Sequence, residues 1–240
     1  MTARMAVGAE RRAQESFSNA PLRTLLSWSS GKDSAWALHT LRSDHRYEVV
    51  GLMTTINSAA DRVAMHAVRS ELLRRQAAAT GLPVWELSIP SPCSNEEYEA
   101  VMRKTIERAK AEAIDCFAFG DLFLQDIRHY REQQLRGSGL TPLFPIWGRD
   151  THELAREMIA GGLRARITCV DPRVIPADLA GREFDLQLLH DLPAAADPCG
   201  ERGEFHTFAY DGPMFRTPIT ISSGEIVTRD GFVFADLIPE

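Results

Sequence analysis

Short apolar runs alternate with longer segments of helical spacing through the first two thirds of the chain. The runs have strand length and are rich in β-branched residues. The segments between them place apolar residues three or four positions apart, as amphipathic helices do. This pattern predicts strands at 22–28, 47–55, 83–89, 116–121, 141–147 and 164–171. It predicts helices at 31–42, 64–81, 94–113, 124–139 and 151–162.

Local signals mark several ends of these elements. Ser94 followed by Glu97 has the capping-box spacing, and Gly81 with Pro83 ends the preceding helix. Strands that alternate with helices favour βαβ units, and hence a parallel sheet with helices on both faces. Ligands of such α/β folds bind beyond the carboxyl ends of the strands. The loop after the first strand and Gly120–Asp121 after the fourth are both expected at that edge.

After residue 171 the pattern changes, because glycine and proline become frequent and helical spacing weakens. Short strands are predicted at 203–212, 216–225 and 226–237, with a hairpin turn at Ser222–Ser223–Gly224. These features predict a small C-terminal α+β module whose boundary falls near 145–150 or at 171. We expect a polar leader (1–21), a nucleotide-binding domain (22–147) and a substrate-binding module (148–240).

Composition narrows the function classes. The 240 residues carry a net charge of −6, which disfavours a nucleic-acid partner, since such binding needs an excess of lysine and arginine. No apolar run approaches the roughly 20 residues of a membrane span, and the N-terminus lacks the apolar segment of a signal peptide. None of the four cysteines forms a C-x-x-C pair, which argues against a structural zinc site. These observations predict a cytoplasmic protein.

The loop "SWSSGKDS" (27–34) contains the residue types of a phosphate-binding loop in an unusual order. In the kinase-type loop, a lysine is followed at once by a hydroxyl residue, and a glycine stands five positions before the second glycine. Here Asp33 follows Lys32, and Leu26 stands at the earlier glycine position. The kinase-type interpretation therefore fails at two places.

The same residues can form a shorter cradle for pyrophosphate. Gly31 lets the backbone approach a ligand, and the N-terminus of the following helix favours an anion. Ser29 and Ser34 can donate hydroxyl hydrogen bonds, and Lys32 adds positive charge. Asp33 would repel phosphate unless it holds Mg²⁺ or caps the helix. The alternative is an ordinary helix start with capping serines and a surface lysine.

This loop resembles the PP-loop of the ATP pyrophosphatases, whose pattern is S-G-G-x-D-S/T. Members of that superfamily cleave ATP between the α- and β-phosphates while the loop holds the pyrophosphate. Ser30 departs from the pattern, which has glycine there, and it fits if its φ angle is negative. The resemblance implies ATP as cosubstrate with Mg²⁺. The nucleotide-binding candidates are Ser29, Ser30, Gly31, Lys32, Asp33, Ser34, Met53 and Gly120.

A second signature, "GERGEFHT" (200–207), resembles the G-E-x-G-E-[FY]-x-T pattern of the diphthine–ammonia ligase family. The resemblance covers about 22–220 and is closest to bacterial-type members. It implies an adenine nucleotide alpha hydrolase-like, Rossmann-like fold, and amidation of a carboxylate by ammonium with release of AMP and pyrophosphate. Whether the acid is diphthine or another carboxylate stays open. Further matching blocks lie at 61–83, 120–132, 143–159 and 169–175.

The resemblance also implies roles for particular side chains. Asp33 and Asp121 are candidate metal ligands, and Glu201 with Glu204 could attract ammonium and accept its proton. His206 stands where the family often has glutamate. The catalytic candidates are Lys32, Asp33, Asp121, Glu201 and Glu204. The substrate-binding candidates are His66, Arg128, Gly203, Glu204 and His206.

Several alternatives remain at this point. Asp121 could cap a helix, Arg128 could be a solvated charge, and His206 could be an ordinary strand residue. The chain could instead be a PP-loop tRNA sulfur transferase, although it offers only the isolated Cys199 as a reactive thiol. It could also be an adenine-nucleotide hydrolase or sensor. We expect free ammonium, or ammonia from a partner, as nitrogen source, and a possible homodimer through the hairpin-rich tail.

Overall fold

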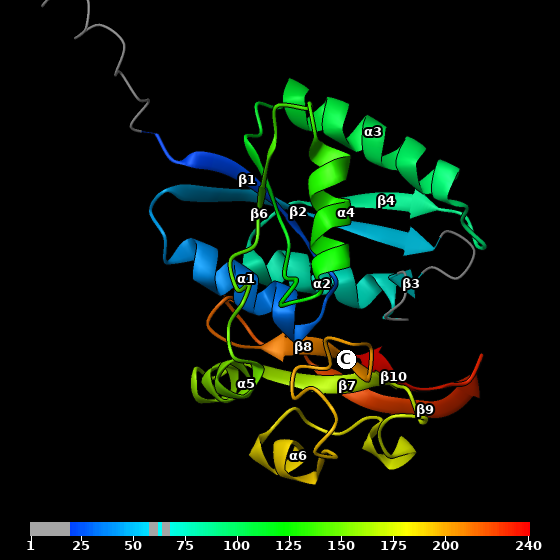
Figure 1. The fold of residues 1–240 in the computed structure, drawn as a ribbon. Helices are drawn as coiled ribbons and strands as arrows, with labels where there is room; N and C mark the ends of the chain where they lie inside the picture. The colour runs from blue at the N-terminus through cyan, green and yellow to red at the C-terminus, as the bar shows by residue number, and fades with distance from the viewer. Residues whose placement is uncertain (1–19, 58–61, 64–67) are drawn as a thin grey trace, which may run out of the picture.

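The computed structural model describes residues 20–57, 62–63 and 68–240, which form two sheets (Figure 1). The first sheet is parallel in the order β4-β2-β1-β5-β6, with the short β3 antiparallel to the end of β2. Its strands are β1 (Leu22–Ser27), β2 (Tyr47–Asn57), β3 (Arg62–Val63), β4 (Val84–Ile89), β5 (Cys116–Ala118) and β6 (Thr141–Leu143).

Helices cover both faces of this sheet, which confirms the predicted α/β class. In Figure 1, α1 (Lys32–Arg42) and α2 (Ser70–Thr80) lie on one side, and α3 (Asn95–Ala111) and α4 (Gln125–Leu135) lie on the other. The alternation of β1 explains this arrangement. Leu26 packs in the core that includes residues of α1 and α2, whereas its neighbour Leu25 packs in a second core that includes residues of α3.

The second sheet is antiparallel, in the order β8-β7-β10-β9. Figure 1 shows α1 and α2 between the two sheets, and one hydrophobic core is continuous from Leu26 to Phe208. The strands are β7 (Arg164–Val170), β8 (Phe205–Asp211), β9 (Ile221–Arg229) and β10 (Phe232–Pro239). The helices of this half are α5 (Thr151–Ala160), α6 (Leu186–Asp191) and the 3₁₀ turn η2 (Ala177–Leu179).

The strand at 164–171 pairs in the second sheet, within the range 148–240 predicted for the C-terminal module. The predicted position of the hairpin turn is wrong. The hairpin turn lies at Asp230–Gly231, whose φ angles are 52° and 81°, and not at 222–224, which lies inside β9. Asp-Gly accepts these left-handed angles readily and sets the register of β9 and β10.

Several element boundaries also differ from the predictions; for example, β5 ends at Ala118 and not at 121, and α4 ends at Leu135 and not at 139. The described part of α2 begins at Ser70, because Arg69 is extended and bridges Arg62; 64–67 lie outside the described residues. The strand expected at 141–147 ends at Leu143. Residues 1–19 of the expected leader are not described, and the division at residue 147 stays a prediction. Within the described ranges, no helix combines the length and apolar character that crossing a bilayer requires.

Candidate active site

The loop between β1 and α1 is held by its neighbours on both sides. The Trp28 backbone N–H donates to the Met53 carbonyl at 2.8 Å, and the Thr54 hydroxyl donates to the Trp28 carbonyl at 2.6 Å. The Trp28 indole N–H donates to the Gln76 amide oxygen at 2.9 Å. The first sheet and α2 thus fix the loop before any ligand binds.

Ser30 adopts a conformation that the sequence did not suggest. Its φ angle is +69°, so the expectation of a negative φ is wrong. Its carbonyl accepts hydrogen bonds from Ala209 N–H at 2.9 Å and from the Gln76 amide at 3.0 Å, which hold the backbone in this turn. Its hydroxyl is buried and has no hydrogen-bond partner among the described residues. A glycine, as in the family pattern, would adopt this φ angle without strain and would bury no unpaired hydroxyl.

The N-terminus of α1 is suited to an anion. Gly31 is its N-cap, and no side chain caps it from that position. The Ser29 and Ser34 hydroxyls lie 3.1 Å apart beside it. The Lys32 backbone N–H donates to the Thr207 hydroxyl of β8 at 3.1 Å, so the second sheet borders this helix end. Helix N-termini bind phosphate through such backbone N–H groups and the helix dipole.

Lys32 is buried, with 2% of its surface exposed, and joins the two halves of the molecule. Its ammonium donates to Asp33 Oδ2 at 2.9 Å and to the Cys199 carbonyl, and it lies over the rings of Phe184 and Phe205. Burial by itself would lower the pKa of Lys32, but Asp33 beside it leaves that pKa above its ordinary value. Lys32 is therefore a charged link between the loop and the C-terminal half.

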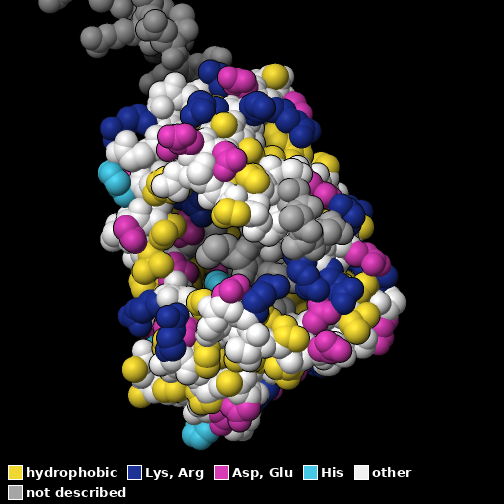
Figure 2. Space-filling model, turned by 90° about the vertical axis from the view of Figure 1, so that its right-hand side faces the viewer, with side chains coloured by type: hydrophobic (Ala, Val, Ile, Leu, Met, Phe, Trp, Pro, Cys, Tyr) yellow, Lys and Arg dark blue, Asp and Glu magenta, His cyan; other side chains and the backbone are white. Residues whose placement is uncertain are grey.

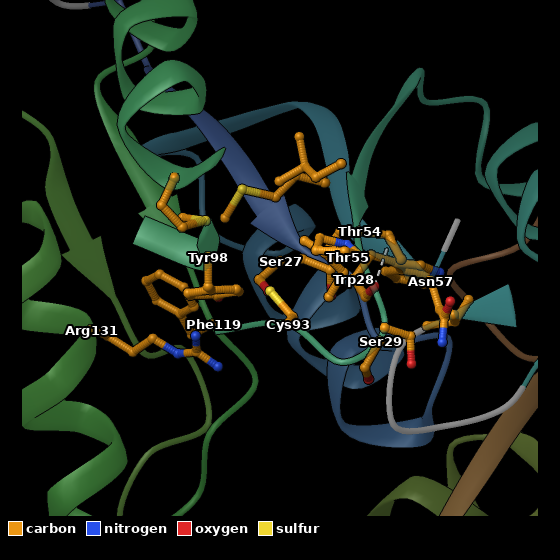
Figure 3. Close-up of a pocket in the computed structure, with 17 residues that line it drawn as sticks. Ser27, Trp28, Ser29, Thr54, Thr55, Asn57, Cys93, Tyr98, Phe119 and Arg131 are labelled. Carbon is orange, nitrogen blue, oxygen red and sulfur yellow. Dashed lines mark hydrogen bonds between the residues drawn. The ribbon is translucent and has the colours of Figure 1, made fainter. Parts of the chain in front are cut away.

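A cavity of about 530 Å³ lies beyond the carboxyl ends of β1, β2 and β4 (Figure 3). This volume falls within the usual range for small-molecule sites. Met53, predicted to contact nucleotide, lines it. Tyr98 and Phe119 add aromatic surface, and Thr54 with Thr55 adds polar groups. The mixture suits a nucleoside.

A second cavity, of about 310 Å³, lies against the loop and the start of α1. Both cavities are lined by Ser27, Ser29, Phe119 and Arg131, so they meet. Figure 2 looks onto this side of the molecule, where a hollow is bordered by both acidic and basic side chains. The predicted residues that line the second cavity are Ser29, Gly31, Lys32, Asp33, Ser34, Gly120, Asp121, Glu201 and His206.

Burial raises the pKa of three carboxylates that line this second cavity, and neighbouring negative charges add to the rise. Burial raises the pKa of Asp33, against the effect of Lys32, and burial raises that of Asp121, against Arg131. Burial and the charges of Asp33 and Asp121 raise the pKa of Glu201 to about 7, although a hydrogen bond from Leu122 N–H opposes this. Such a cluster favours a cation at its centre.

Asp33 and Asp121 fit a magnesium ion bound together with phosphates. Asp33 Oδ1 and Asp121 Oδ2 are buried and have no hydrogen-bond partner among the described residues. In the same ranges, no three His, Cys, Asp or Glu side chains are grouped to hold a metal by themselves. Mg²⁺ commonly uses one or two carboxylates, with substrate phosphates and water completing its shell.

Glu204 and Gly203 are not among the residues that line either cavity. Glu204 is 3% exposed, and its two oxygens accept backbone N–H bonds from Asp197 and Arg202, each at 2.9 Å. It therefore stabilises the 197–204 loop that carries Glu201. Gly203, with a φ angle of 89°, supplies a turn in that loop. Their predicted catalytic and substrate contacts stay predictions.

The remaining substrate candidates are distributed differently. His206 lines the smaller cavity, and burial, aided by Lys32, lowers its pKa to about 4, so it is neutral near pH 7. Arg128 lines neither cavity; it bonds Glu132 at 2.8 Å and lies over the Phe144 ring. His66 lies outside the described residues.

Several residues that line the larger cavity were not among the sequence candidates. Thr54, Thr55 and Asn57 could have been found from the rule that ligands bind at strand ends. Arg131 could not, because choosing between it and Arg128 requires the rotation of α4 about its axis. Tyr98 reaches the cavity from α3, far along the chain from the loop.

Comparison with known proteins agrees with this geometry. A family model described as "Diphthamide synthase N-terminal domain" matches residues 22–142, and one described as "Diphthamide synthase C-terminal domain" matches residues 150–236. The chain belongs to the diphthamide synthase family. The predicted resemblance is thereby confirmed over both halves of the chain.

Curated relatives of this diphthamide synthase family member carry the name diphthine–ammonia ligase. The protein from Bos taurus is 28% identical over 200 residues, which cover 80% of this chain and 70% of that protein. The one from Danio rerio is 28% identical over 229 residues, covering 86% and 89%. The one from Mus musculus is 27% identical over 236 residues, covering 86% and 85%.

Proposed function

We propose that the protein is an ATP-dependent ligase that adenylates a carboxylate and amidates it with ammonium, releasing AMP and pyrophosphate. One observation carries the proposal: a nucleoside-sized cavity meets a phosphate cradle that is lined by three carboxylates. The similarity to proteins named diphthine–ammonia ligase supports this choice among the reactions of PP-loop enzymes.

In the first step, a carboxylate oxygen of the substrate attacks the α-phosphorus of ATP. The bond from that phosphorus to the bridging oxygen breaks, and its electron pair leaves with pyrophosphate. The N-terminus of α1, with Ser29 and Ser34, holds the departing phosphates. Asp33 and Asp121 would hold Mg²⁺, which neutralises phosphate charge when bound.

In the second step, ammonia attacks the acyl carbon, the bond from that carbon to the AMP oxygen breaks with its electron pair leaving on AMP, and the nitrogen releases a proton to solvent. Ammonium must first lose a proton, and a carboxylate with a pKa of about 7 is a suitable acceptor at neutral pH. Glu201 is the candidate, because it lines the smaller cavity with Asp33 and Asp121. The same negative charges would attract ammonium into the site.

Sulfur transfer has less support. Cys199 is 1% exposed, and burial raises the pKa of its thiol, so that thiolate formation is disfavoured. All four cysteines are free thiols, in keeping with a reducing cytoplasmic location. No observation favours a hydrolase or sensor over a ligase.

The identity of the acid and the oligomeric state also belong to the proposal. The acid is diphthine or another carboxylate, free or carried on a protein.

A homodimer through β9 is supported by its place at the sheet edge and by Ile226 and Val227, which are 61% and 44% exposed. Sedimentation equilibrium tests that contact: an Ile226→Lys variant should shift a dimer to monomer, and a wild-type monomer would reject it.

A pyrophosphate-release screen tests the proposed reaction. The protein is incubated with ATP, Mg²⁺, NH₄⁺ and a panel of carboxylic acids. An acid-dependent rise in pyrophosphate and AMP, with formation of the amide, supports the proposal. Glu201→Gln should retain acid-dependent adenylation and lose most of the amide product. Pyrophosphate release that no acid stimulates would reject the ligase and favour a hydrolase.

A further inference from the structure

Arg131 lies where the two cavities meet. It belongs to α4, and its guanidinium is centred 5.0 Å from the Phe119 ring, with Nε 3.7 Å from Asp121 Oδ2. Figure 3 shows the side chain reaching from α4 beside Phe119 toward the side of the cavity where Ser29 lies. Of the four residues that line both cavities, Arg131 is the charged one.

The groups around Arg131 leave hydrogen bonds unmade. Its Nε is buried and has no hydrogen-bond partner among the described residues, and the same holds for Asp121 Oδ2. The two atoms form an ion pair at 3.7 Å, but this distance is too long for a good hydrogen bond. Both residues line the smaller cavity. Buried polar atoms are almost always paired, so unmade hydrogen bonds beside a cavity indicate a missing partner.

The two cations predicted for the site, Lys32 and Arg128, are already engaged. Lys32 is buried and bound to Asp33 and to the Cys199 carbonyl. Arg128 is bound to Glu132 and lies over aromatic rings outside both cavities. Arg131 is thus the cation best placed at the junction between a nucleoside and its phosphates.

We propose that Arg131 binds the α-phosphate of the nucleotide and stabilises the charge that develops there during adenylation. The inference rests on the proposed function and assigns a catalytic residue within it. As the carboxylate attacks and pyrophosphate leaves, negative charge is carried by the non-bridging oxygens of the α-phosphate. A guanidinium presents planar paired donors that match two such oxygens. The guanidinium lies over the Phe119 ring, which packs against it on one side.

The affinities of AMP and adenosine test this assignment without knowledge of the acid. The two ligands share the nucleoside and differ in the α-phosphate. Calorimetry on the full chain should show that Arg131→Gln weakens AMP about 10- to 100-fold, the usual range for a lost charge-assisted hydrogen bond. Adenosine should bind wild type and variant equally, which also shows that the variant is folded.

Two further variants sharpen the result. Arg136→Gln makes the same chemical change at the exposed C-cap of α4 and should leave both affinities unchanged. Arg131→Lys keeps the charge but not the paired donors, so AMP should bind it with intermediate affinity. It also provides a second test if Arg131→Gln folds poorly.

Other outcomes would overturn the inference. Equal weakening of AMP and adenosine by Arg131→Gln would assign Arg131 to the nucleoside or to folding. Weakening of AMP by Arg128→Gln, with no effect of Arg131→Gln, would assign the phosphate to Arg128. In both cases the wild type still binds nucleotide and the proposed function stands. A wild type that binds neither AMP nor adenosine would reject the proposed function itself.

Discussion

Ser30 carries two energetic costs that a glycine would avoid. Its left-handed φ angle and its buried, unpartnered hydroxyl each oppose folding. Ser30→Gly should therefore raise the free energy of unfolding by about 1–2 kcal/mol, measured by urea denaturation. Ser29→Gly, at the neighbouring position of the loop, serves as the control and should bring no such gain. A loss of stability in Ser30→Gly would mean that the hydroxyl has a stabilising contact.

Glu201 predicts a pH dependence of stability. Its pKa is about 7 in the folded protein, against an ordinary value of 4.5, so between these values the native state keeps a proton that the unfolded chain has released. The free energy of unfolding should fall as pH rises through this window, by about 1–3 kcal/mol. Asp33 and Asp121, whose pKa values are also raised, add to the same trend. The charge of Lys32 limits the rise in the pKa of Asp33.

Denaturation between pH 4.5 and 7.5, without nucleotide or divalent cation, measures how the free energy of unfolding falls between the unfolded-state and folded-state pKa values of Glu201. Glu201→Gln should flatten the part that Glu201 contributes and leave the aspartate part. Identical pH profiles for wild type and variant would show that Glu201 does not hold its proton in the native state.

At the residue scale, the sequence predicts those groups of the site that are neighbours along the chain. The order of residues 29–34 predicted the cradle, because a strand-to-helix turn brings neighbours in sequence together in space. The sequence could not show that the Lys32 ammonium donates to the Cys199 carbonyl, because that contact joins segments far apart along the chain. For the same reason the sequence could not show that, of these two glutamates, Glu201 lines the smaller cavity and Glu204 does not.

At the scale of elements, the loop that follows β5 approaches the start of α1 closely and borders the cradle. A Cβ atom on Gly120 would lie 3.0 Å from both the Asp33 carbonyl carbon and the Ser34 nitrogen, which are backbone atoms. Gly120→Ala should therefore separate the two elements, cost about 1–3 kcal/mol of stability and weaken nucleotide binding. Thermal denaturation and AMP calorimetry check this. An unchanged melting temperature and affinity would show that the contact is not required.

Periodicity predicted most helices, because each buries one face in a core, and it predicted the parallel strands, because helices bury both of their faces. It did not predict which sheet β7 joins, since a buried strand has the same pattern in either. The Ser-Ser-Gly stretch at 222–224 also has a turn composition, but the β9–β10 turn lies at Asp230–Gly231, whose left-handed angles make a two-residue hairpin.

At the scale of the whole molecule, the site depends on both sheets. The first sheet supplies the nucleoside cavity and the loop, and the second supplies Thr207, His206 and the segment that carries Glu201. The buried Lys32 ties the two together through Asp33 and Cys199. Adenylation and amidation can thus occur at one site, formed where the two cavities meet.

The identity of the nucleotide products tests this account most directly. Phosphorus-31 NMR can follow ATP in the presence of the protein, Mg²⁺, NH₄⁺ and an acid that stimulates turnover. Attack at the α-phosphorus predicts AMP and pyrophosphate in equal amounts, with one amide formed for each. ADP and inorganic phosphate as the products would contradict the account.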